Sequence, residues 1–458
     1  MDACLVDAAA EPGAVPVYAA TTATVEETIA SLPQPMSQWA QANGFEGKAG
    51  SVLACPDASG QIVVALLGLG APGSEDPFAA GALHKLPRGT YKLHQGFDDL
   101  AMSVLAFALS GYRFERYRSE KPAAVQLVMP SDIARPDLAR EIEAVRLVRD
   151  LVNTPANDLG PAEIADAAQR LAERYDASVS VVEGQALEEG FPMVHAVGKA
   201  SPRAPLLIDL QWGAPDAPKV TLVGKGVVFD TGGLDIKPPS SMLLMKKDMG
   251  GAAHALGLAQ LIMDAKLPVR LRVLIPSAEN AISGAAFRPG DVLQSRKGLT
   301  VEIGNTDAEG RLILADALAL ADEEAPELLI DFATLTGAAR VGLGPELPAL
   351  FTGDDALAAD IAAHAEKMHD PLWRLPLWPG YKSWLRSDIA DVNHISSQPL
   401  AGAITAALFL QRFVEKAAAW VHLDVYAWSS SDRPGHPKGG DAQTIRALYA
   451  LLKARYTS

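Results

Sequence analysis

Short runs of apolar residues, many of them β-branched, alternate along the chain with stretches of helical periodicity. The apolar runs cover residues 61–67, 125–129, 206–210, 220–223, 271–275 and 328–332. Continuous apolar strands separated by helices are typical of parallel sheets that are covered on both faces. The pattern therefore predicts an α/β fold with mainly parallel sheets.

A change of pattern after residues 130–132 is the clearest candidate for a domain boundary. A strongly helical stretch begins near Arg135 and stops at residues 153–157, whose asparagines and proline end helices. A chain of 458 residues also exceeds what one hydrophobic core usually supports. We therefore predict two α/β domains and a connecting helix, with the smaller domain over residues 1–133, the helix over 134–155 and the larger domain over 156–458.

The chain is acidic and poor in cysteine. Its formal net charge of −15 at pH 7 opposes binding to nucleic acid or to an anionic membrane surface. Cys4 and Cys55 are its only cysteines, which excludes a disulfide framework and suits a reducing compartment. The apolar runs are far shorter than the ~20 residues of a membrane-spanning helix, and the first residues lack the basic region of a secretory signal. We expect a cytoplasmic protein.

Four acidic residues of the larger domain stand at predicted strand ends and helix starts, beside glycines. They are Asp230, Asp248, Asp307 and Glu309. Carboxylates that are brought together in a partly buried site repel one another, so each needs a cation, a proton or several hydrogen bonds. Divalent metal ions supply such cations, and two ions that share carboxylates can bind both the nucleophile and the leaving group. The four acids therefore predict a two-metal hydrolase site at the ends of parallel strands.

Three basic residues accompany the acids. Lys225 and Lys237 flank Asp230 in loop sequence. A lysine binds metal only as the neutral amine, whereas a lysine that stays charged can polarise a substrate carbonyl. Arg311 lies where a loop enters a helix, which is a favourable place for an anion. Any one aspartate before a helix is usually an N-cap and any one strand-end lysine a surface charge, but seven such residues in the loops of one domain favour a functional site.

The motifs that carry these residues resemble those of the leucyl aminopeptidase family, which is also called the cytosol aminopeptidase or M17 family. Asn305-Thr306-Asp307-Ala308-Glu309-Gly310-Arg311-Leu312 is similar to the signature octapeptide of the family without a mismatch. Further family motifs resemble residues 150–157, 225–233, 236–238, 247–253, 283–284 with 288–291, 334–338 and 422–424. The resemblance covers most of residues 148–425.

The resemblance implies two divalent ions in each subunit. Asp230 and Glu309 would bridge the two ions, Lys225 and Asp248 would complete the ligands of one, and Asp307 would complete those of the other. Zinc or manganese is the first expectation, although magnesium and cobalt suit the same oxygen and amine ligands. The family also implies a homo-oligomer, most simply a hexamer.

The resemblance further implies an aminopeptidase that acts on peptides with a free N-terminus. A metal-activated water would attack the first peptide bond, while Lys237 and a metal stabilise the oxyanion. Arg311 would hold a bicarbonate that carries the proton to the leaving amine. Met245, Thr334 and Gly337 match positions of the pocket for the first residue.

The sequence departs from the family pattern in three places. The N-terminal domain is shorter than is typical and carries no recognised motif, so its role in assembly is open. Asp235 adds an acid to the metal loop, with an effect on the amine pocket or none. Tyr426 and Trp428 stand where small residues are usual, and they either change the first-residue pocket or pack in the core. The preference for leucine is therefore in doubt.

Two other classes of function compete with this interpretation. Residues 68–73 form a Gly-x-Gly-x-x-Gly sequence after an apolar strand, as in a dinucleotide-binding loop, but Pro72 and Pro77 disfavour an immediate helix and an ordinary turn explains the glycines better. A DNA-binding or scaffolding subunit of the same fold is the second alternative, against which the negative charge and the complete ligand set count. The sequence lacks the motifs of single-zinc proteases, serine hydrolases and P-loop proteins.

Overall fold

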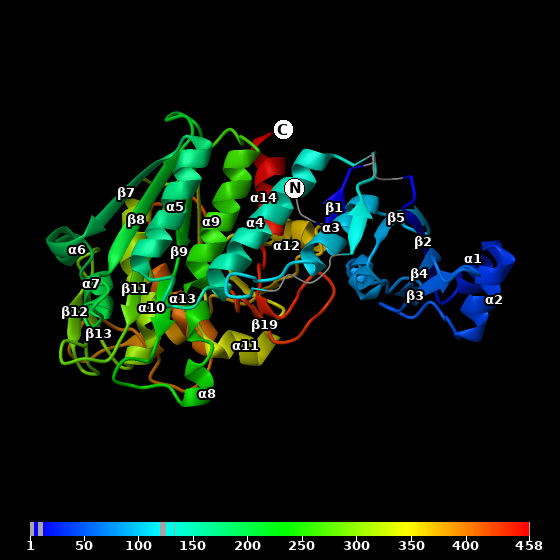
Figure 1. Cartoon of the computed structure of the whole chain (residues 1–458). Helices are drawn as coiled ribbons and strands as arrows, with labels where there is room; N and C mark the ends of the chain where they lie inside the picture. Colours follow the sequence, from blue (N-terminus) through cyan, green and yellow to red (C-terminus); the bar gives the residue numbers. More distant parts are fainter. Residues whose placement is uncertain (1–3, 8–11, 120–124, 132, 458) are drawn as a thin grey trace. The chain divides into compact units, whose positions relative to one another are not determined.

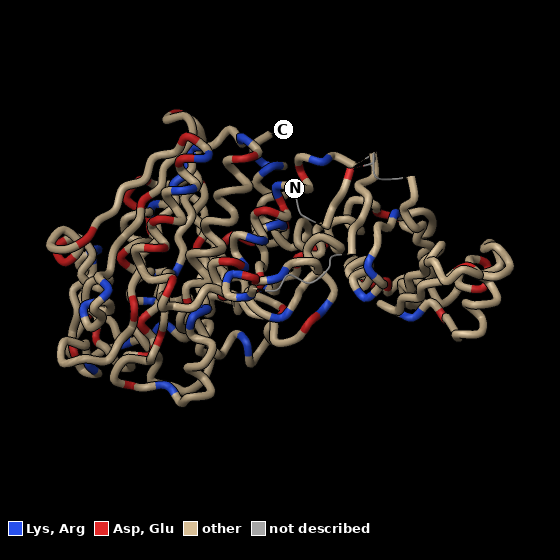
Figure 2. Tube along the Cα trace, in the orientation of Figure 1, with Lys and Arg blue, Asp and Glu red and all other residues tan. Residues whose placement is uncertain are grey.

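A computed structural model of the chain describes residues 4–7, 12–119, 125–131 and 133–457. The chain divides into two compact units, of which the first comprises Met1–Arg146 with Ser429–Lys438 and the second comprises Leu147–Trp428 with Gly439–Ser458. Helix α4 (Arg135–Asn153) spans the predicted helical stretch and contributes residues to both units. Figure 2 shows basic residues interspersed with acidic ones along both units, so the net negative charge is not confined to one segment.

The first unit is built on one sheet, whose described strands lie in the order β1-β6-β5-β2-β4-β3. Neighbouring strands are parallel except for β3 and β4. The strands are β1 (Leu5–Val6), β2 (Val15–Thr21), β3 (Val52–Pro56), β4 (Ile62–Gly70), β5 (Thr90–Gln95) and β6 (Gln126–Val128), and the helices are α1 (Val25–Ser31), α2 (Gln34–Ala42), α3 (Leu100–Ser110) and the 3-10 helix η2 (Ala79–Lys85). The apolar runs at 61–67 and 125–129 are thus strands, as predicted.

The glycines of the Gly-x-Gly-x-x-Gly sequence are explained by packing inside this sheet. Gly68 and Gly70 belong to β4, and the next described element is the 3-10 helix η2 rather than an immediate α-helix. A Cβ atom on Gly68 would lie 2.0 Å from the carbonyl oxygen of Lys48. The glycines therefore allow a neighbouring backbone segment to approach the strand, which is an ordinary reason for glycine in a sheet.

The second unit contains a larger mixed sheet, with strand order β16-β15-β18-β14-β9-β11-β8-β7 and with β10 beside β11 (Figure 1). The central strands β18, β14, β9 and β11 run parallel, whereas β8, β7 and β15 join antiparallel to their inner neighbours. The strands are β7 (Ser178–Glu183), β8 (Leu206–Trp212), β9 (Lys219–Gly224), β10 (Gly226–Asp230), β11 (Arg270–Asn280), β14 (Leu328–Ala333), β15 (Ala349–Phe351), β16 (Trp373–Arg374) and β18 (Trp420–Asp424). The centre of the sheet is therefore parallel, as the apolar runs predict.

Helices cover both faces of this sheet. Helix α9 (Gly250–Asp264) packs on β9 and β14, and α10 (Glu309–Glu323) packs on β9 and β11 from the other face (Figure 1). The other helices are α5 (Pro161–Tyr175), α6 (Gly184–Gly190), α7 (Pro192–Gly198), α8 (Pro239–Met242), α11 (Gly337–Leu343), α12 (Asp355–Lys367), α13 (Gly402–Gln411) and α14 (Ile445–Tyr456), with 3-10 helices η3 (Met245–Met249), η4 (Thr306–Ala308) and η5 (Pro379–Leu385). Among the helices of the described residues, none is long and apolar enough to cross a lipid bilayer.

Small sheets complete the described structure. Strands β12 (Val292–Gln294), β13 (Thr300–Glu302) and β17 (Val392–Asn393) form one of them. Strands β19 (Trp428–Ser429) and β20 (Gly439–Gly440) form the other.

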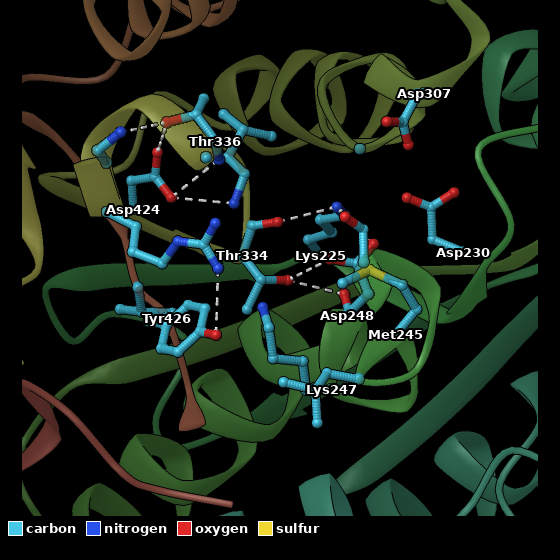
Figure 3. A pocket seen from close by; sticks show the side chains of 18 of the residues that line it. Lys225, Asp230, Met245, Lys247, Asp248, Asp307, Thr334, Thr336, Asp424 and Tyr426 are labelled. Atoms are coloured by element: carbon cyan, nitrogen blue, oxygen red, sulfur yellow. Dashed lines mark hydrogen bonds and ion pairs between the residues drawn. The ribbon is translucent and has the colours of Figure 1, made fainter. Parts of the chain in front are cut away.

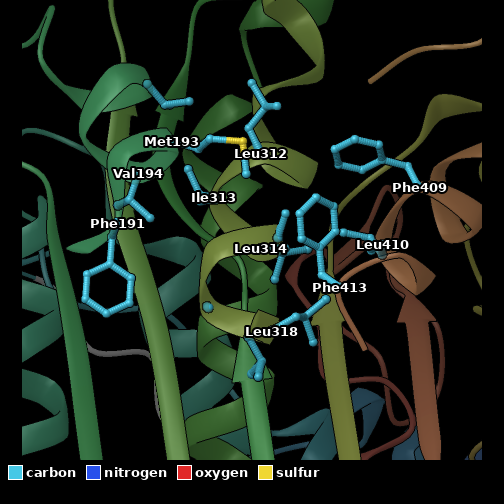
Figure 4. Packing of buried hydrophobic residues seen from close by; sticks show 14 of the residues in the cluster. Phe191, Met193, Val194, Leu312, Ile313, Leu314, Leu318, Phe409, Leu410 and Phe413 are labelled. Atoms are coloured by element: carbon cyan, nitrogen blue, oxygen red, sulfur yellow. The ribbon is translucent and has the colours of Figure 1, made fainter. Parts of the chain in front are cut away.

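Helix α10 is the centre of the largest described core cluster of the second unit. Its residues Leu312, Leu314 and Leu318 are fully buried, and they pack with Phe409 of α13 and with Phe413 (Figure 4). The helix is apolar on nearly every side because the sheet covers one side and α7 and α13 cover others. This packing fixes the first turn of α10, which carries Glu309 and Arg311.

The buried leucines of α10 lead to a prediction about the free energy of unfolding. Leu314→Ala removes a fully buried side chain, so we expect the free energy of unfolding to fall by about 2–5 kcal/mol. Leu400→Ala is the matched control, because Leu400 is 65% exposed and a surface substitution changes stability by less than about 0.5 kcal/mol. Urea unfolding followed by circular dichroism measures both. Equal losses in the two variants would contradict the assignment of the core.

Candidate functional site

The ends of two neighbouring strands bring the first acid into place. Asp230 is the last residue of β10, and its register partner is Asn280, the last residue of the parallel strand β11. The Asn280 Nδ2 donates to Asp230 Oδ1 at 2.8 Å and to the carbonyl oxygen of Thr306 at 3.1 Å. The Glu309 Oε2 lies 3.5 Å from the same amide nitrogen. One amide therefore links the strand end to the segment that precedes α10.

Lys225 occupies the break between β9 and β10. Its backbone N–H donates to the carbonyl oxygen of Phe332, which extends the pairing of β9 with β14 by one residue. The buried Lys225 Nζ lies 2.7 Å from Asp248 Oδ2 and 3.1 Å from Glu309 Oε1. It also donates to the carbonyl oxygen of Thr334 at 3.0 Å (Figure 3). The ammonium thus joins acids from two different segments.

The segment at residues 305–312 folds as the short 3-10 helix η4 followed by the first turn of α10. Asn305 caps it, because its side chain accepts a hydrogen bond from the N–H of Asp307 at 2.8 Å. Glycine occupies position 310 for a steric reason, because a Cβ atom there would lie 2.6 Å from the Lys225 Nζ. A larger residue at position 310 would therefore displace the ammonium from the acids.

Asp248 and Lys237 complete the cluster. Asp248 lies in η3 and accepts a hydrogen bond at Oδ1 from Thr334 Oγ1 at 2.8 Å. Lys237 follows β10, and its Nζ lies 2.9 Å from Asp230 Oδ2 and forms an ion pair with Asp307. The sequence-predicted acids and lysines therefore come together in one cluster, with Lys225 and Lys237 as its two cations.

The charges of the cluster shift its pKa values in the directions expected for crowded carboxylates. Burial and the charge of Asp230 raise the pKa of Glu309 well above its ordinary value and that of Asp307 to about 6. Burial opposes the charge of Lys225, but the Asp248, Glu309 and Asp230 carboxylates outweigh it and raise the pKa of this lysine. Without added cations, the negative charge of the four acids in the cluster is compensated by its two lysines.

The cluster fits a group of divalent cations. Oxygens of Asp230, Asp307 and Glu309 all lie within 4.8 Å of one another. Asp248 Oδ2, Asp307 Oδ1 and Glu309 Oε1 are buried and contact lysine ammonium groups, yet accept no hydrogen bond of good geometry. Buried carboxylate oxygens of this kind need a stronger partner, and a hard or borderline metal ion provides one.

Arg311 lies beside the cluster in the first turn of α10. It is 8% exposed, and its Nη1 donates to the carbonyl oxygen of His394 at 2.7 Å, whereas its buried Nε has no hydrogen-bond partner among the described residues. Burial lowers the pKa of Arg311 to about 10, and the charges of Glu309 and Asp424 partly oppose this shift. The guanidinium is therefore charged at neutral pH, and its Nε is a donor that no described residue uses.

A cavity of about 430 Å³ opens over the cluster. It is lined by all seven charged residues predicted from the sequence and by the three predicted pocket residues Met245, Thr334 and Gly337. Figure 3 shows Lys247 and Tyr426 on the side of this cavity that is opposite Asp230 and Asp307. The cavity thus has an acid-rich end and a separate region that contains a lysine.

The structure also assigns residues whose part in the site was not predicted. Asn280 is one, and its place at a strand end beside β10 was a signal that could have found it. Asp235 accepts hydrogen bonds at Oδ2 from Thr306 N at 2.8 Å and Thr306 Oγ1 at 3.1 Å, so it ties the loop after β10 to η4. Tyr426 lines the cavity, whereas Trp428 lies under Lys246, at 5.6 Å from its Nζ.

The α/β fold and the buried carboxylate cluster at its strand ends define the class of the protein as a metal-dependent hydrolase. Residues 146–449 match the "Cytosol aminopeptidase family, catalytic domain", and residues 15–130 match the "M17 aminopeptidase, N-terminal domain". The chain therefore belongs to the cytosol aminopeptidase (M17) family, as the motifs predicted. It is a metal-dependent aminopeptidase, a metalloexopeptidase.

Relatives match over nearly the whole chain. A probable cytosol aminopeptidase of Syntrophotalea carbinolica is 38% identical over 473 residues, which cover 94% of both chains. The crystal structure of a cytosol aminopeptidase from Coxiella burnetii superposes with a TM-score of 0.95 at 47% identity and covers 99% of both chains. The bottromycin maturation enzyme BotP in complex with Mn has a TM-score of 0.86 at 36% identity and covers 96% of this chain and 99% of that one.

Divalent metal should stabilise the folded chain more strongly as the pH rises. Because Asp307 has an ordinary pKa of 3.8 and a folded pKa of about 6, the metal-free fold binds the extra proton between these values, and its stability falls as pH rises through them. Metal competes with this proton, so it binds more tightly above that range. At a fixed Mn²⁺ concentration, about 100 times its dissociation constant at pH 7, calorimetry should show a gain of about 2.7 kcal/mol in the free energy of unfolding at pH 7 and a smaller gain below the pKa of Asp307.

The controls for this prediction separate the cluster from the general acidity of the chain. Asp307→Asn should lose most of the Mn²⁺-dependent gain, whereas Asp360→Asn, which changes an exposed acid of α12, should keep it. A chelator should reverse the gain. A Mn²⁺ effect that is independent of pH, or equal in the two variants, would contradict metal binding at these carboxylates.

Proposed function

We propose that this aminopeptidase removes the first residue of peptides at a dinuclear site held by Lys225, Asp230, Asp248, Asp307 and Glu309. The observation that carries the proposal is the cluster of three carboxylates whose oxygens lie within 4.8 Å of one another. Asp248 and Lys225 stand beside it, joined at 2.7 Å. Four acids and an amine are enough to hold two ions, with Asp230 and Glu309 shared between them.

The nature of the ions follows from ligand chemistry and from a relative. Oxygen ligands with one amine suit zinc and manganese and also accept magnesium or cobalt, and BotP is known in complex with Mn. When bound, the ions would supply positive charge for a substrate carbonyl and lower the pKa of a water. They would also neutralise the acids that now hold Lys225 as an ammonium, so the neutral amine could become a ligand and metal binding would release protons.

The residues of the chain position the reacting groups. Lys237 keeps its charge between Asp230 and Asp307, where it can stabilise the oxyanion that forms on the substrate carbonyl. Asn280 holds Asp230 by a 2.8 Å hydrogen bond and so maintains the ligand geometry. Arg311, which lines the cavity, would hold bicarbonate, and a bicarbonate there would supply a group that can accept and donate a proton near the leaving amine.

Assembly and location are part of the same proposal. The family membership supports a homo-oligomer, with a hexamer as the first state to test. The names of relatives as cytosol aminopeptidases and the scarcity of cysteine support a cytoplasmic enzyme. Analytical ultracentrifugation of the full chain tests the hexamer.

The site assignment predicts different failures for a ligand and for a charged residue that only stabilises the oxyanion. Glu309→Gln should lose bound metal and activity together. Lys237→Met should keep its metal content, but kcat should fall by about 10²–10³-fold, the usual cost of removing an oxyanion donor. Metal is measured by elemental analysis and kcat with a leucine amide. Lys382→Met, on the exposed side of η5, is the control and should retain both. Full activity in either site variant would refute the assignment.

The mechanism also predicts an absolute need for a free N-terminus. If the α-amine of the substrate binds at the metal site, acetylation delocalises its lone pair into an amide, so the nitrogen can no longer bind a metal ion and cleavage should fall below detection. Paired aminoacyl and acetyl-aminoacyl amides should be assayed with Mn²⁺ and again after chelation. Cleavage of acetylated substrates, or indifference to chelation, would exclude this mechanism.

A further inference from the structure

Lys247 is a buried cation on the wall of the cavity, away from the carboxylate cluster. It is only 6% exposed, yet it lines the cavity. Within the described parts of the chain its ammonium has no hydrogen bond or ion pair, and its contact is the ring of Tyr426, whose centroid is 4.6 Å away. A buried charge that has only a ring for a partner is costly. An anion that enters the cavity would remove this cost.

Asp424 and Asp248, the acids nearest to Lys247, make their hydrogen bonds and ion pairs with other groups. Asp424 Oδ1 accepts from the N–H groups of Leu335 and Thr336 at 3.0 and 3.2 Å, and its Oδ2 accepts from Thr336 Oγ1 at 2.6 Å. Asp248 contacts Lys225 and accepts from Thr334. Neither carboxylate is therefore directed at Lys247, and the compensating anion has to come from the ligand.

A second cation faces the same aromatic ring. Arg340 of α11 places its Cζ 5.3 Å from the centroid of Tyr426, and its Nη1 donates to the Tyr426 hydroxyl at 3.3 Å. Arg340 also lines the cavity and is exposed at its rim. The cavity is thus lined by two cations outside the cluster, Lys247 and Arg340. Figure 3 shows Lys247 near Tyr426 and away from Asp230 and Asp307.

We propose that this aminopeptidase selects peptides whose first residue is glutamate or aspartate, and that Lys247 and Arg340 bind the side-chain carboxylate. The proposal rests on the function proposed above, in which the α-amine binds at the metal site that includes Asp248. Lys247 directly precedes Asp248 in η3, so a carboxylate one side-chain length from the α-amine can reach its ammonium. Tyr426 supports both cations through its ring and its hydroxyl. Bidentate recognition by Arg340 would add geometric selectivity.

Isosteric substrates give the sharpest test. The metal-loaded enzyme should be assayed with glutamyl, glutaminyl, aspartyl, asparaginyl, leucyl and methionyl amides of a fluorescent amine. We expect kcat/KM for the glutamyl amide to exceed that for the glutaminyl amide by about 10- to 100-fold, because a charged contact replaces a neutral one. These amides have no C-terminal carboxylate, so the ratio reports only the side chain of the first residue.

Two lysine variants test whether the Glu/Gln ratio of kcat/KM depends on the side chain of Lys247. Lys247→Met should bring the Glu/Gln ratio of kcat/KM to about one or below, and the glutamyl/leucyl ratio should fall with it. This variant removes a buried unpaired charge, so it should fold at least as well as the parent chain. Lys246→Met is the matched control in the same 3-10 helix, because the Lys246 Nζ donates to the carbonyl oxygen of Asn153 at 2.6 Å and does not line the cavity. It should keep the ratio of the parent chain.

The outcomes distinguish this inference from the proposed function. If leucyl and methionyl amides are cleaved and the glutamyl amide is no better than the glutaminyl one, the acidic selectivity is wrong while the aminopeptidase site stands. A high ratio that survives in Lys247→Met would also refute the inference, because another group would then bind the carboxylate. If none of the free aminoacyl amides is cleaved with metal present, the proposed function itself fails. Arg340→Gln should lower the ratio less than Lys247→Met, since Arg340 lies at the rim.

Discussion

The compensation of four crowded carboxylates by two lysines is the constraint on which the second unit depends. Lys225 and Lys237 contact acids that come from β10, η3, η4 and α10, at distances such as 2.7 Å to Asp248 and 2.9 Å to Asp230. Burial makes each charge more costly and each opposite contact stronger. The break between β9 and β10, and the glycine at position 310, both serve to bring the Lys225 ammonium to this place.

Most of this arrangement could be predicted from the sequence, because parallel strands end at one edge of a sheet. The apolar runs located β9, β11 and β14, and the polar residues that follow such strands must then lie near one another. Strand direction at the sheet margins could not be predicted in the same way. The runs of β8 and β14 are equally apolar, yet β8 is antiparallel to its neighbour β11. Hydrophobic pattern reports burial, while direction depends on connections and packing.

The residues that sequence reasoning missed are those whose burial is set by distant segments. Lys247 belongs to a Lys-Lys-Asp sequence that resembles a surface segment, and its burial in the wall of the cavity beside Tyr426 depends on a residue far along the chain. Arg340 reaches the same ring from α11, far along the chain. For Asp235 the sequence left open an effect on the amine pocket or none, and its hydrogen bond with Thr306 depends on two loops that approach one another. The spacing of residues within one motif does not indicate which distant segments of the chain will contact it.

The short 3-10 helix η3 couples the two ends of the cavity. With about three residues per turn, Met245 and Asp248 project from the same side of η3, while Lys247 is rotated away from them. The residue that turns to Tyr426 is thus joined by one peptide bond to the residue that contacts Lys225. A change in the pocket at position 247 can shift Asp248 only through this stiff turn, which Thr334 holds by hydrogen bonds to both the backbone and the side chain of Asp248. Substrate preference can therefore vary at position 247 while the carboxylate cluster keeps its geometry.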